Sequence, residues 1–98
     1  MFYKLHESKY GMTIAVADEN LIGKTLKHGK IEFFVNPRFY KGTKASKEYL
    51  LEFLKKAVNI NLVGKESVDC GIEAGVVDKK HILMIGKVPH AQTVVMLM

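Results

Sequence analysis

The sequence predicts an α+β fold in which strands and helices are segregated along the chain. Three observations support this class: alternating residues near the N-terminus, helically spaced apolar residues in the middle, and β-branched residues near the C-terminus. The 98 residues are the size of one domain, so we expect a single α+β domain spanning residues 1–98. The chain is 48% hydrophobic and 26% charged, and no apolar run approaches the roughly 20 residues that cross a bilayer. We therefore expect a cytoplasmic protein with no membrane partner.

The first two strands are expected to form a hairpin. Residues 2–6 alternate in the period-two pattern of a half-buried strand. Residues 12–17 contain the β-branched Ile14 and Val16, which favour a second strand, and residues 8–11 form the turn between the two.

A third strand is predicted at residues 30–35. Before it, residues 18–20 cap a short helical turn over residues 20–22, which Gly23 ends. The strand stops at Asn36-Pro37, because proline has no N–H to donate to a neighbouring strand. Residues 36–45 then form a basic and aromatic loop, and loops of this length are often functional.

Two helices follow. Ser46 is the expected N-cap of a helix that runs to about residue 58, with Leu50, Phe53, Leu54 and Ala57 facing the core.

Residues 59–64 are expected to link this helix to a second one at residues 65–74, which ends at Gly75 as a left-handed C-cap. A last strand is predicted at residues 81–85 and a bend at residues 86–92. The three N-terminal strands and the C-terminal strand are expected to share one sheet, and residues 93–98 are β-prone and either join that sheet or fray.

The positive charge is concentrated in one part of the chain. The net charge is +5, yet the stretch from Lys24 to Lys47 holds seven basic side chains and one acid, Glu32, a net of +6. The rest of the chain has eight basic and nine acidic side chains. Such a cluster attracts polyanions through salt-sensitive electrostatics.

Aromatic residues lie between these charges. An exposed aromatic ring can stack on an unpaired base, a contact worth about 1–3 kcal/mol. Strand alternation places one of Phe33 and Phe34 in the core, so only part of the group is available. The alternative is a solvated lysine surface in which Phe39 and Tyr40 anchor the loop.

Catalytic and metal-binding signatures are weak. The four histidines have no zinc-ligand spacing, and the single cysteine, Cys70, fits a reducing compartment and a small packing residue. Gly23-Lys24-Thr25 lacks the earlier glycine of a phosphate-binding loop, because Asp18 stands at that position. We predict no catalytic residue, no metal and no cofactor.

Several segments resemble a small archaeal family known as domain of unknown function 424, and the resemblance extends through Gln92. The matching segments are Lys4-x-His6-Glu7, Leu21-x-Gly23-Lys24, residues 61–64, residues 73–75 and, most specifically, residues 85–92. The resemblance implies an archaeal cytoplasmic protein of a family suspected of RNA binding in translation or ribosome assembly. It brings no catalytic residue with it.

The leading hypothesis is an RNA-binding module without catalysis. In this hypothesis Tyr40 stacks on a base, and His90 and Gln92 contribute selectivity because their side chains offer hydrogen-bond donors and acceptors. Alternatively, Pro89–Gln92 is only a structural turn. The RNA backbone is held by Lys24, Lys27, Lys30, Arg38, Lys41 and Lys44.

Two other functions remain open. The first is a protein-interaction or oligomerising subunit that uses residues 93–98 to add a strand to a partner or to a second copy. The second, weaker one is a small hydrolase-like enzyme centred on His90 and a carboxylate brought near it by folding.

Overall fold

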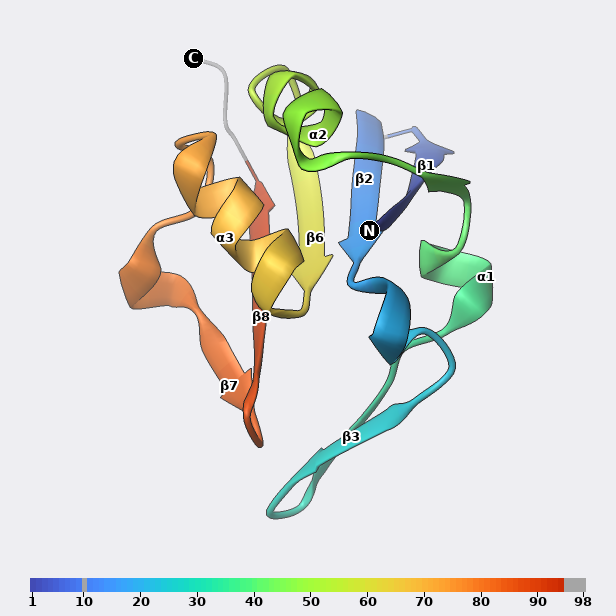
Figure 1. The fold of residues 1–98 in the computed structure, drawn as a ribbon, viewed down its shortest axis with the longest axis vertical. Helices are drawn as coiled ribbons and strands as arrows, with labels where there is room; N and C mark the ends of the chain where they lie inside the picture. Colours follow the sequence, from blue (N-terminus) through green and yellow to red (C-terminus); the bar gives the residue numbers. More distant parts are fainter. Residues whose placement is uncertain (10, 95–98) are drawn as a thin grey trace.

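A six-stranded mixed sheet forms the centre of the structure, and a separate two-stranded ribbon lies at one end of it (Figure 1). The computed structural model describes residues 1–9 and 11–94. The strands are β1 (Phe2–Ser8), β2 (Gly11–Ala17), β3 (Thr25–His28), β4 (Ile31–Phe34), β5 (Thr43–Lys44), β6 (Asn59–Val63), β7 (Leu83–Ile85) and β8 (Val88–Val94). The helices are α1 (Pro37–Tyr40), α2 (Lys47–Leu54) and α3 (Lys65–Glu73), with 3-10 turns η1 (Glu19–Leu21) and η2 (Lys79–His81). The predicted α+β class is confirmed.

The large sheet has the strand order β5-β1-β2-β6-β8-β7. β1 and β2 form the predicted antiparallel hairpin. β6 lies parallel to β2 and antiparallel to β8, so it is a central strand. The prediction that residues 59–64 form a link was therefore wrong. Asn59 and Asn61 alternate with apolar neighbours as in a half-buried strand, but asparagine is uncommon in strands and hid the pattern.

The predicted third strand forms as β4, but it is not part of the large sheet. It pairs antiparallel with β3, which the sequence analysis missed, in a two-stranded ribbon. Gly29 supplies the positive φ of 59° at the turn between the two strands. The prediction placed three N-terminal strands on one sheet, and this part of it is corrected.

The predicted loop at residues 36–45 contains two short elements. Asn36 is the N-cap of α1, because its Oδ1 accepts a hydrogen bond from the backbone N–H of Arg38 at 3.0 Å. Pro37 fits the first helical position, where no N–H is needed. The two residues of β5 then pair with the start of β1.

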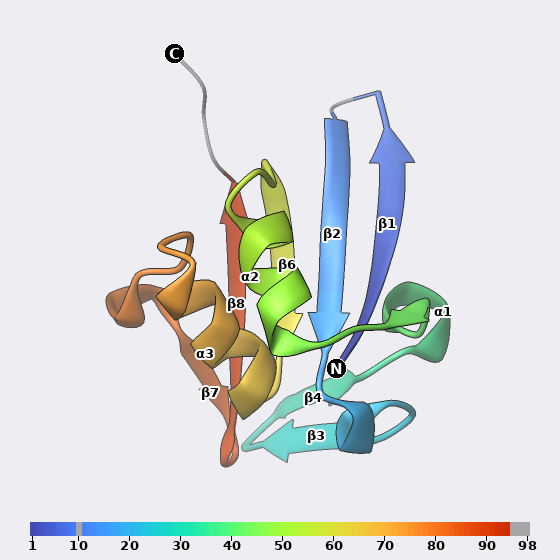
Figure 2. The same ribbon diagram turned by 45° about the horizontal axis from the view of Figure 1, so that its top comes forward.

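Helices α2 and α3 cover one face of the large sheet (Figures 1 and 2). Ser46 caps α2 as predicted, since its Oγ accepts from the N–H of Tyr49 at 3.2 Å. Leu50 and Leu54 are fully buried, and α2 ends at Leu54, earlier than predicted. The main core on this face consists of Ile14, Val16, Leu50, Leu54, Ile60, Leu62, Val68, Cys70, Val77 and Ala91.

The end of β2 is tied to the start of α3 by a buried carboxylate. Asp18 Oδ1 accepts from the N–H and the hydroxyl of Ser67, both at 2.8 Å, and Oδ2 accepts from the N–H of Glu66 at 3.1 Å. These bonds satisfy orphan donors at the helix start. Asp18 was expected to cap the turn at residues 20–22, but its side chain caps α3 instead.

The opposite face of the large sheet is covered only in part. The β3–β4 ribbon and α1 pack against one end of it, around a second core of Ala15, Ala17, Leu21, Val35, Tyr40 and Val63. The remainder of this face stays accessible, around Thr13, Asn59 and Gln92. This open area supplies part of the candidate site.

The C-terminal strands differ from the prediction. The strand predicted at residues 81–85 starts at Leu83, because η2 occupies residues 79–81. Residues 86–92, predicted as a bend, enter strand β8 after a tight turn at Gly86, where φ is 66°. Both strands belong to the large sheet, as predicted for the C-terminal strands. The expectation for residues 95–98 lies outside the described residues.

Candidate nucleic-acid interface

Half of the predicted basic residues lie on the β3–β4 ribbon, which we call the basic ribbon. Lys24 immediately precedes β3, Lys27 lies within it, and Lys30 follows the turn. All three side chains are exposed. Lys27 lies 3.9 Å from Glu32, an exposed ion pair that contributes little, and Lys24 and Lys30 have no ion pair within residues 1–9 and 11–94. These two charges are therefore available to a polyanion.

The other three basic residues lie on α1, just after it, and on β5. Arg38 and Lys41 are exposed and unpaired in the described part of the chain, and Lys41 Nζ lies 5.9 Å from the ring of Phe2. Lys44 Nζ lies 3.3 Å from Glu19. The predicted basic set thus forms two groups, one on the ribbon and one around α1, at the same end of the large sheet (Figure 2).

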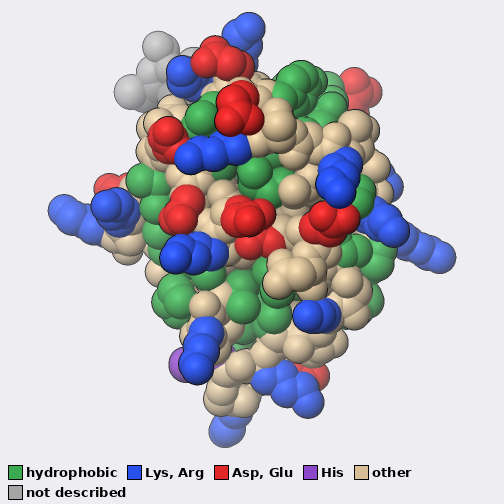
Figure 3. Space-filling model, in the orientation of Figure 1, with side chains coloured by type: hydrophobic (Ala, Val, Ile, Leu, Met, Phe, Trp, Pro, Cys, Tyr) green, Lys and Arg blue, Asp and Glu red, His purple; other side chains and the backbone are tan. Residues whose placement is uncertain are grey.

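Acidic residues are few in this part of the chain, because Glu32 on β4 is the single acid between Lys24 and Lys47 and Glu19 contacts Lys44 from η1. On the face seen in Figure 3, acidic and basic side chains are interspersed over the helices, and basic side chains project from the lower end, where Figure 1 shows the ribbon. Three exposed acids, Glu66, Asp69 and Glu73, belong to α3. The excess of positive charge between Lys24 and Lys47 therefore favours the approach of a polyanion to the ribbon end.

Tyr40 does not have the predicted stacking role. Only 2% of the residue is exposed, so no base can reach its ring. Its hydroxyl donates to Asn61 Oδ1 over 2.5 Å, and burial raises the pKa of the phenol well above its ordinary value. The prediction that Tyr40 stacks on RNA is therefore wrong. The alternative prediction, that Tyr40 anchors this segment, agrees with its buried position.

Phe34 is the exposed aromatic of the basic ribbon. Phe33 pairs with Leu26 and turns inward, where its ring centroid lies 4.9 Å from that of His90. Phe34 therefore points outward and is 52% exposed. Alternation indicated that either Phe33 or Phe34 would be buried. Which of the two it is depends on the pairing with β3, and that strand was not predicted from the sequence.

A polar groove lies on the open face of the large sheet, and we call it the sheet-face groove. Its volume is about 260 Å³. Strand pairing places Thr13 beside His6 on one side and beside Asn59 on the other, and the next row places Asn61 beside Gln92. The polar and aromatic residues that line it are His6, Thr13, Phe39, Asn59, Asn61, Gln92 and Thr93.

His90 is half-buried and contacts Asn61, which lines this groove. Its Nε2 lies 3.2 Å from Asn61 Oδ1, and its ring packs against Phe33 of the ribbon. Burial lowers the pKa of the imidazole below its ordinary value, so His90 is neutral near pH 7. Its hydrogen-bond partner is an amide, so the carboxylate that the enzymatic alternative requires is not at this position.

Gln92 is exposed and lies within the sheet-face groove. The predicted pair His90 and Gln92 thus lies on one side of β8, with the histidine in the packed part and the glutamine in the open part. Asn59 and Asn61, which complete the polar surface, were not predicted as site residues. Their signal was the alternation Asn-Ile-Asn-Leu in residues 59–62.

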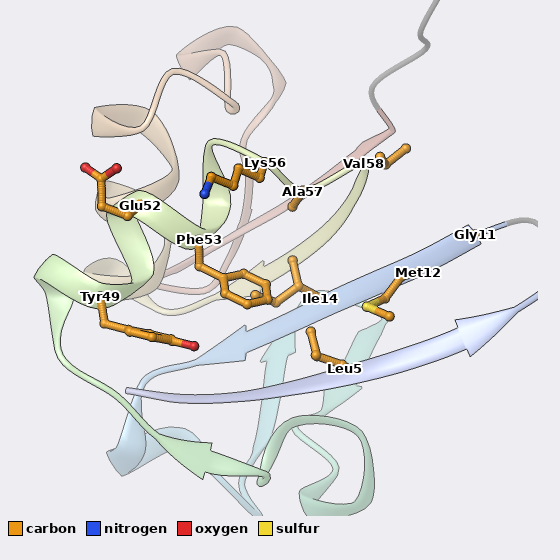
Figure 4. A pocket seen from close by; sticks show the side chains of 10 residues that line it. All are labelled: Leu5, Gly11, Met12, Ile14, Tyr49, Glu52, Phe53, Lys56, Ala57 and Val58. Carbon is orange, nitrogen blue, oxygen red and sulfur yellow. The ribbon is translucent and has the colours of Figure 1, made fainter.

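An apolar groove of about 600 Å³ lies on the helical side of the sheet, between α2 and the β1–β2 hairpin (Figure 4). Leu5, Met12 and Ile14 project from the strands, and Phe53 faces them from α2. Leu5 and Met12 are 40% and 41% exposed, which is unusual for large apolar side chains on the inner face of a sheet.

Three other features bear on function: the Cys70 thiol, the metal-ligating side chains and the lengths of the helices. Burial raises the pKa of the Cys70 thiol, which disfavours the reactive thiolate. No group of three metal-ligating side chains occurs in the described part of the chain. No helix there is long and apolar enough to span a membrane.

Comparison with known proteins assigns the chain to a family. The family model described as "Protein of unknown function (DUF424)" matches residues 6–96, nearly the whole chain. The chain belongs to the DUF424 family. The resemblance inferred from the sequence is thereby confirmed at the level of the family.

The fold of this DUF424 protein is also found in a solved structure. The crystal structure of an uncharacterized conserved protein from Methanopyrus kandleri superposes with a TM-score of 0.85 at 22% sequence identity. The match covers 99% of this chain and 94% of the other. At this identity the likeness establishes the fold alone. No curated protein matches the DUF424 chain in sequence.

Proposed function

We propose that this DUF424 protein binds single-stranded RNA through the basic ribbon. The observation that carries the proposal is Phe34, an exposed phenylalanine on the outward side of a strand whose ribbon carries three exposed lysines. A solvent-exposed phenylalanine loses no favourable contact when a base stacks on it, and the lysines attract the phosphates that flank that base.

The positive charge supplies affinity and orientation. Lys24 and Lys30 are unpaired in the described part of the chain, and Lys27 has only a weak exposed partner. Arg38 and Lys41 extend the positive surface toward α1. Neutralising phosphates releases condensed counterions, so binding of this kind weakens steeply as salt rises.

The side-chain types favour an unpaired strand. A base within a duplex is stacked on both sides and offers no free face to Phe34, whereas a single strand exposes its bases. The ribbon carries lysines rather than arginines, and lysine is a point charge that contacts phosphate without the bidentate geometry that reads guanine. We therefore expect weak sequence preference on the ribbon.

The test uses a fluorescently labelled single-stranded RNA and measures its anisotropy as the full-length protein is added. Phe34→Ala should weaken binding about tenfold, since the stacking contact is worth about 1–3 kcal/mol. The control is Tyr49→Ala, because Tyr49 is 49% exposed on the helical side. Equal affinities of the two variants would contradict the proposal.

Reversal of the ribbon charges tests the proposal independently. Lys24→Glu combined with Lys30→Glu should abolish measurable binding. Lys79→Glu combined with Lys80→Glu makes the same change in net charge near η2 and should leave most of the affinity. If both double variants lose affinity equally, binding depends on net charge alone and the ribbon has no special role.

A second candidate function is assembly of two copies of the chain, and the apolar groove favours it. Val94, at the end of β8, is 68% exposed, and the sequence continues with four apolar residues, 95–98. An extended segment of four residues reaches about 13 Å. We assign the C-terminal segment of a second copy to the apolar groove in this alternative, with Leu5 and Met12 as its contacts.

Measurement of the molecular mass in solution tests the assembly. The full chain should be a dimer, and both deletion of residues 95–98 and Met12→Asp should give monomers. A monomeric full chain would eliminate this candidate. The connection with translation or ribosome assembly and the cytoplasmic location remain predictions from the sequence.

A further inference from the structure

The strongest unassigned feature is the sheet-face groove, where a fixed hydrogen-bond donor meets an open polar surface. Asn61 is only 9% exposed, and its Oδ1 lies within hydrogen-bonding distance of both Tyr40 and His90. These two groups define the orientation of the amide, because both donate to the oxygen. The nitrogen, Nδ2, is therefore directed away from them.

The Nδ2 donor of Asn61 is reached from the groove. In the described part of the chain no hydrogen bond involves this nitrogen, and no buried side-chain nitrogen or oxygen there is left without a partner. Nδ2 is thus accessible, and Asn61 lines the sheet-face groove. A polar side chain that is nine-tenths buried presents one pre-oriented donor to a ligand.

The surrounding side chains offer further hydrogen bonds. Asn59 and Gln92 carry amides that have no hydrogen-bond partner among residues 1–9 and 11–94, and each offers two donors and an acceptor. Thr13 adds a hydroxyl. The floor is formed by adjacent strands of the large sheet, in which Thr13 lies beside Asn59 and Asn61 lies beside Gln92.

One wall of the groove is aromatic. The rings of His6 and Phe39 are stacked, with centroids 4.4 Å apart and an angle of 11° between their planes. His6 Nε2 donates to the carbonyl oxygen of Phe39 at 2.8 Å, which fixes the pair. A flat floor of amides beside an aromatic wall suits a planar ligand that carries hydrogen-bonding groups on its edge.

The size and charge of the groove restrict the class of ligand that fits it. Its volume of about 260 Å³ is below the range of about 300–1,000 Å³ that drug-sized ligands occupy, so it takes one small ring system. Its lining contains no carboxylate, lysine or arginine, which disfavours a ligand recognised by charge alone. Arg38 and Lys41, the basic residues of the α1 group, flank Phe39 in the chain and lie outside the lining.

From this geometry we infer that the sheet-face groove binds one unstacked nucleobase, whose hydrogen-bonding edge is read by Asn61, Asn59 and Gln92. The ribose phosphates of that nucleotide lie outside the groove, toward Arg38 and Lys41. This inference rests on the proposed function, because the base is supplied by the bound single-stranded RNA. In this inference the sheet recognises the identity of the base, and the ribbon supplies affinity for RNA of any sequence. The two surfaces are joined by the Phe33–His90 contact.

The test is an NMR titration of the full-length protein, labelled with ¹⁵N, with AMP, CMP, GMP and UMP in turn. At least one nucleotide should shift the side-chain amide signals of Asn59, Asn61 and Gln92. Ribose 5-phosphate, which has no base, should leave them in place. Absence of shifts with all four nucleotides, or equal shifts with ribose 5-phosphate, would overturn the inference.

Variants separate this site from the ribbon. Asn59→Ala combined with Gln92→Ala should weaken nucleotide binding at least tenfold, and Asn20→Ala, an exposed asparagine on η1, should not. Phe34→Ala should keep the nucleotide-induced shifts and lose affinity for RNA. RNA binding without groove shifts refutes the base pocket alone, whereas groove shifts without ribbon-dependent RNA binding refute the proposed function alone.

Discussion

The hydroxyl of Tyr40 donates a hydrogen bond to Oδ1 of Asn61 over 2.5 Å, joining α1 to the central strand of the sheet. Tyr40 is buried, and burial keeps its phenol protonated by raising the pKa. The same Asn61 oxygen lies 3.2 Å from His90 Nε2. One amide therefore links α1, β6 and β8, and its orientation depends on both partners.

Tyr40→Phe removes the donor and leaves the ring in place. We expect a loss of about 1 kcal/mol in the free energy of unfolding, the usual net value of one hydrogen bond. Urea denaturation measures it. Tyr49→Phe, at an exposed ring whose hydroxyl lies 3.5 Å from that of Tyr3, should stay within about 0.5 kcal/mol of the wild type. An unchanged Tyr40→Phe midpoint would show that the contact contributes nothing.

Gly64→Ala should be more destabilising than Gly75→Ala. Both glycines have positive φ, 107° and 80°, so alanine introduces backbone strain of about 1–3 kcal/mol at either position. At Gly64 a Cβ would also lie 2.3 Å from Cγ of Asp18, the carboxylate that caps α3, whereas at Gly75 it meets nothing within 4 Å. Thermal unfolding of the two variants compares them. Equal losses would mean that the Asp18 cap tolerates displacement.

His90 should make the protein less stable in mild acid. Its pKa in the folded state is lowered by burial, so the unfolded chain, with an ordinary pKa of about 6.5, binds the proton more readily. The contribution of neutral His90 to the free energy of unfolding is complete above about pH 6.5. It declines as the pH falls toward the lowered pKa of His90 in the folded state. His90→Gln should flatten this part of the curve of unfolding free energy against pH. An equally steep curve in the variant would assign the effect to another group.

RNA affinity should depend steeply on salt, and the ribbon lysines should account for part of the slope. For single strands, the slope of log K against log salt is about −0.7 per phosphate contact. Lys24→Ala combined with Lys30→Ala should therefore make the slope shallower by about 1.4. Binding constants at several salt concentrations give the slope, and an unchanged slope would show that neither lysine contacts phosphate.

Local patterns predicted those parts of the fold that depend on neighbours in sequence. The β1–β2 hairpin, the Ser46 cap, the extent of α3 and the Gly75 C-cap all follow from short-range rules and appear in the structure. Val68, placed inward by helical spacing, is buried. The family was also recognised from short segments.

Long-range pairing was harder to predict. β6 carries two asparagines and owes its place to parallel pairing with β2, which no local rule reveals. Strand β3 was not predicted because Lys27 lies in it and lysine is depleted in strands, and without β3 the pairing of β4 outside the large sheet could not be foreseen. Tyr40 was misassigned for the same reason, since only the docking of α1 on the sheet buries its ring.

The most direct test of RNA binding by the ribbon maps the contact surface by NMR. A single-stranded RNA oligomer is added to the ¹⁵N-labelled protein at low salt, and backbone amide shifts are compared along the chain. We expect the largest changes in residues 24–34 and around Arg38, and little change along α2 and α3. Shifts confined to the helices, or absent along the β3–β4 ribbon, would contradict the account.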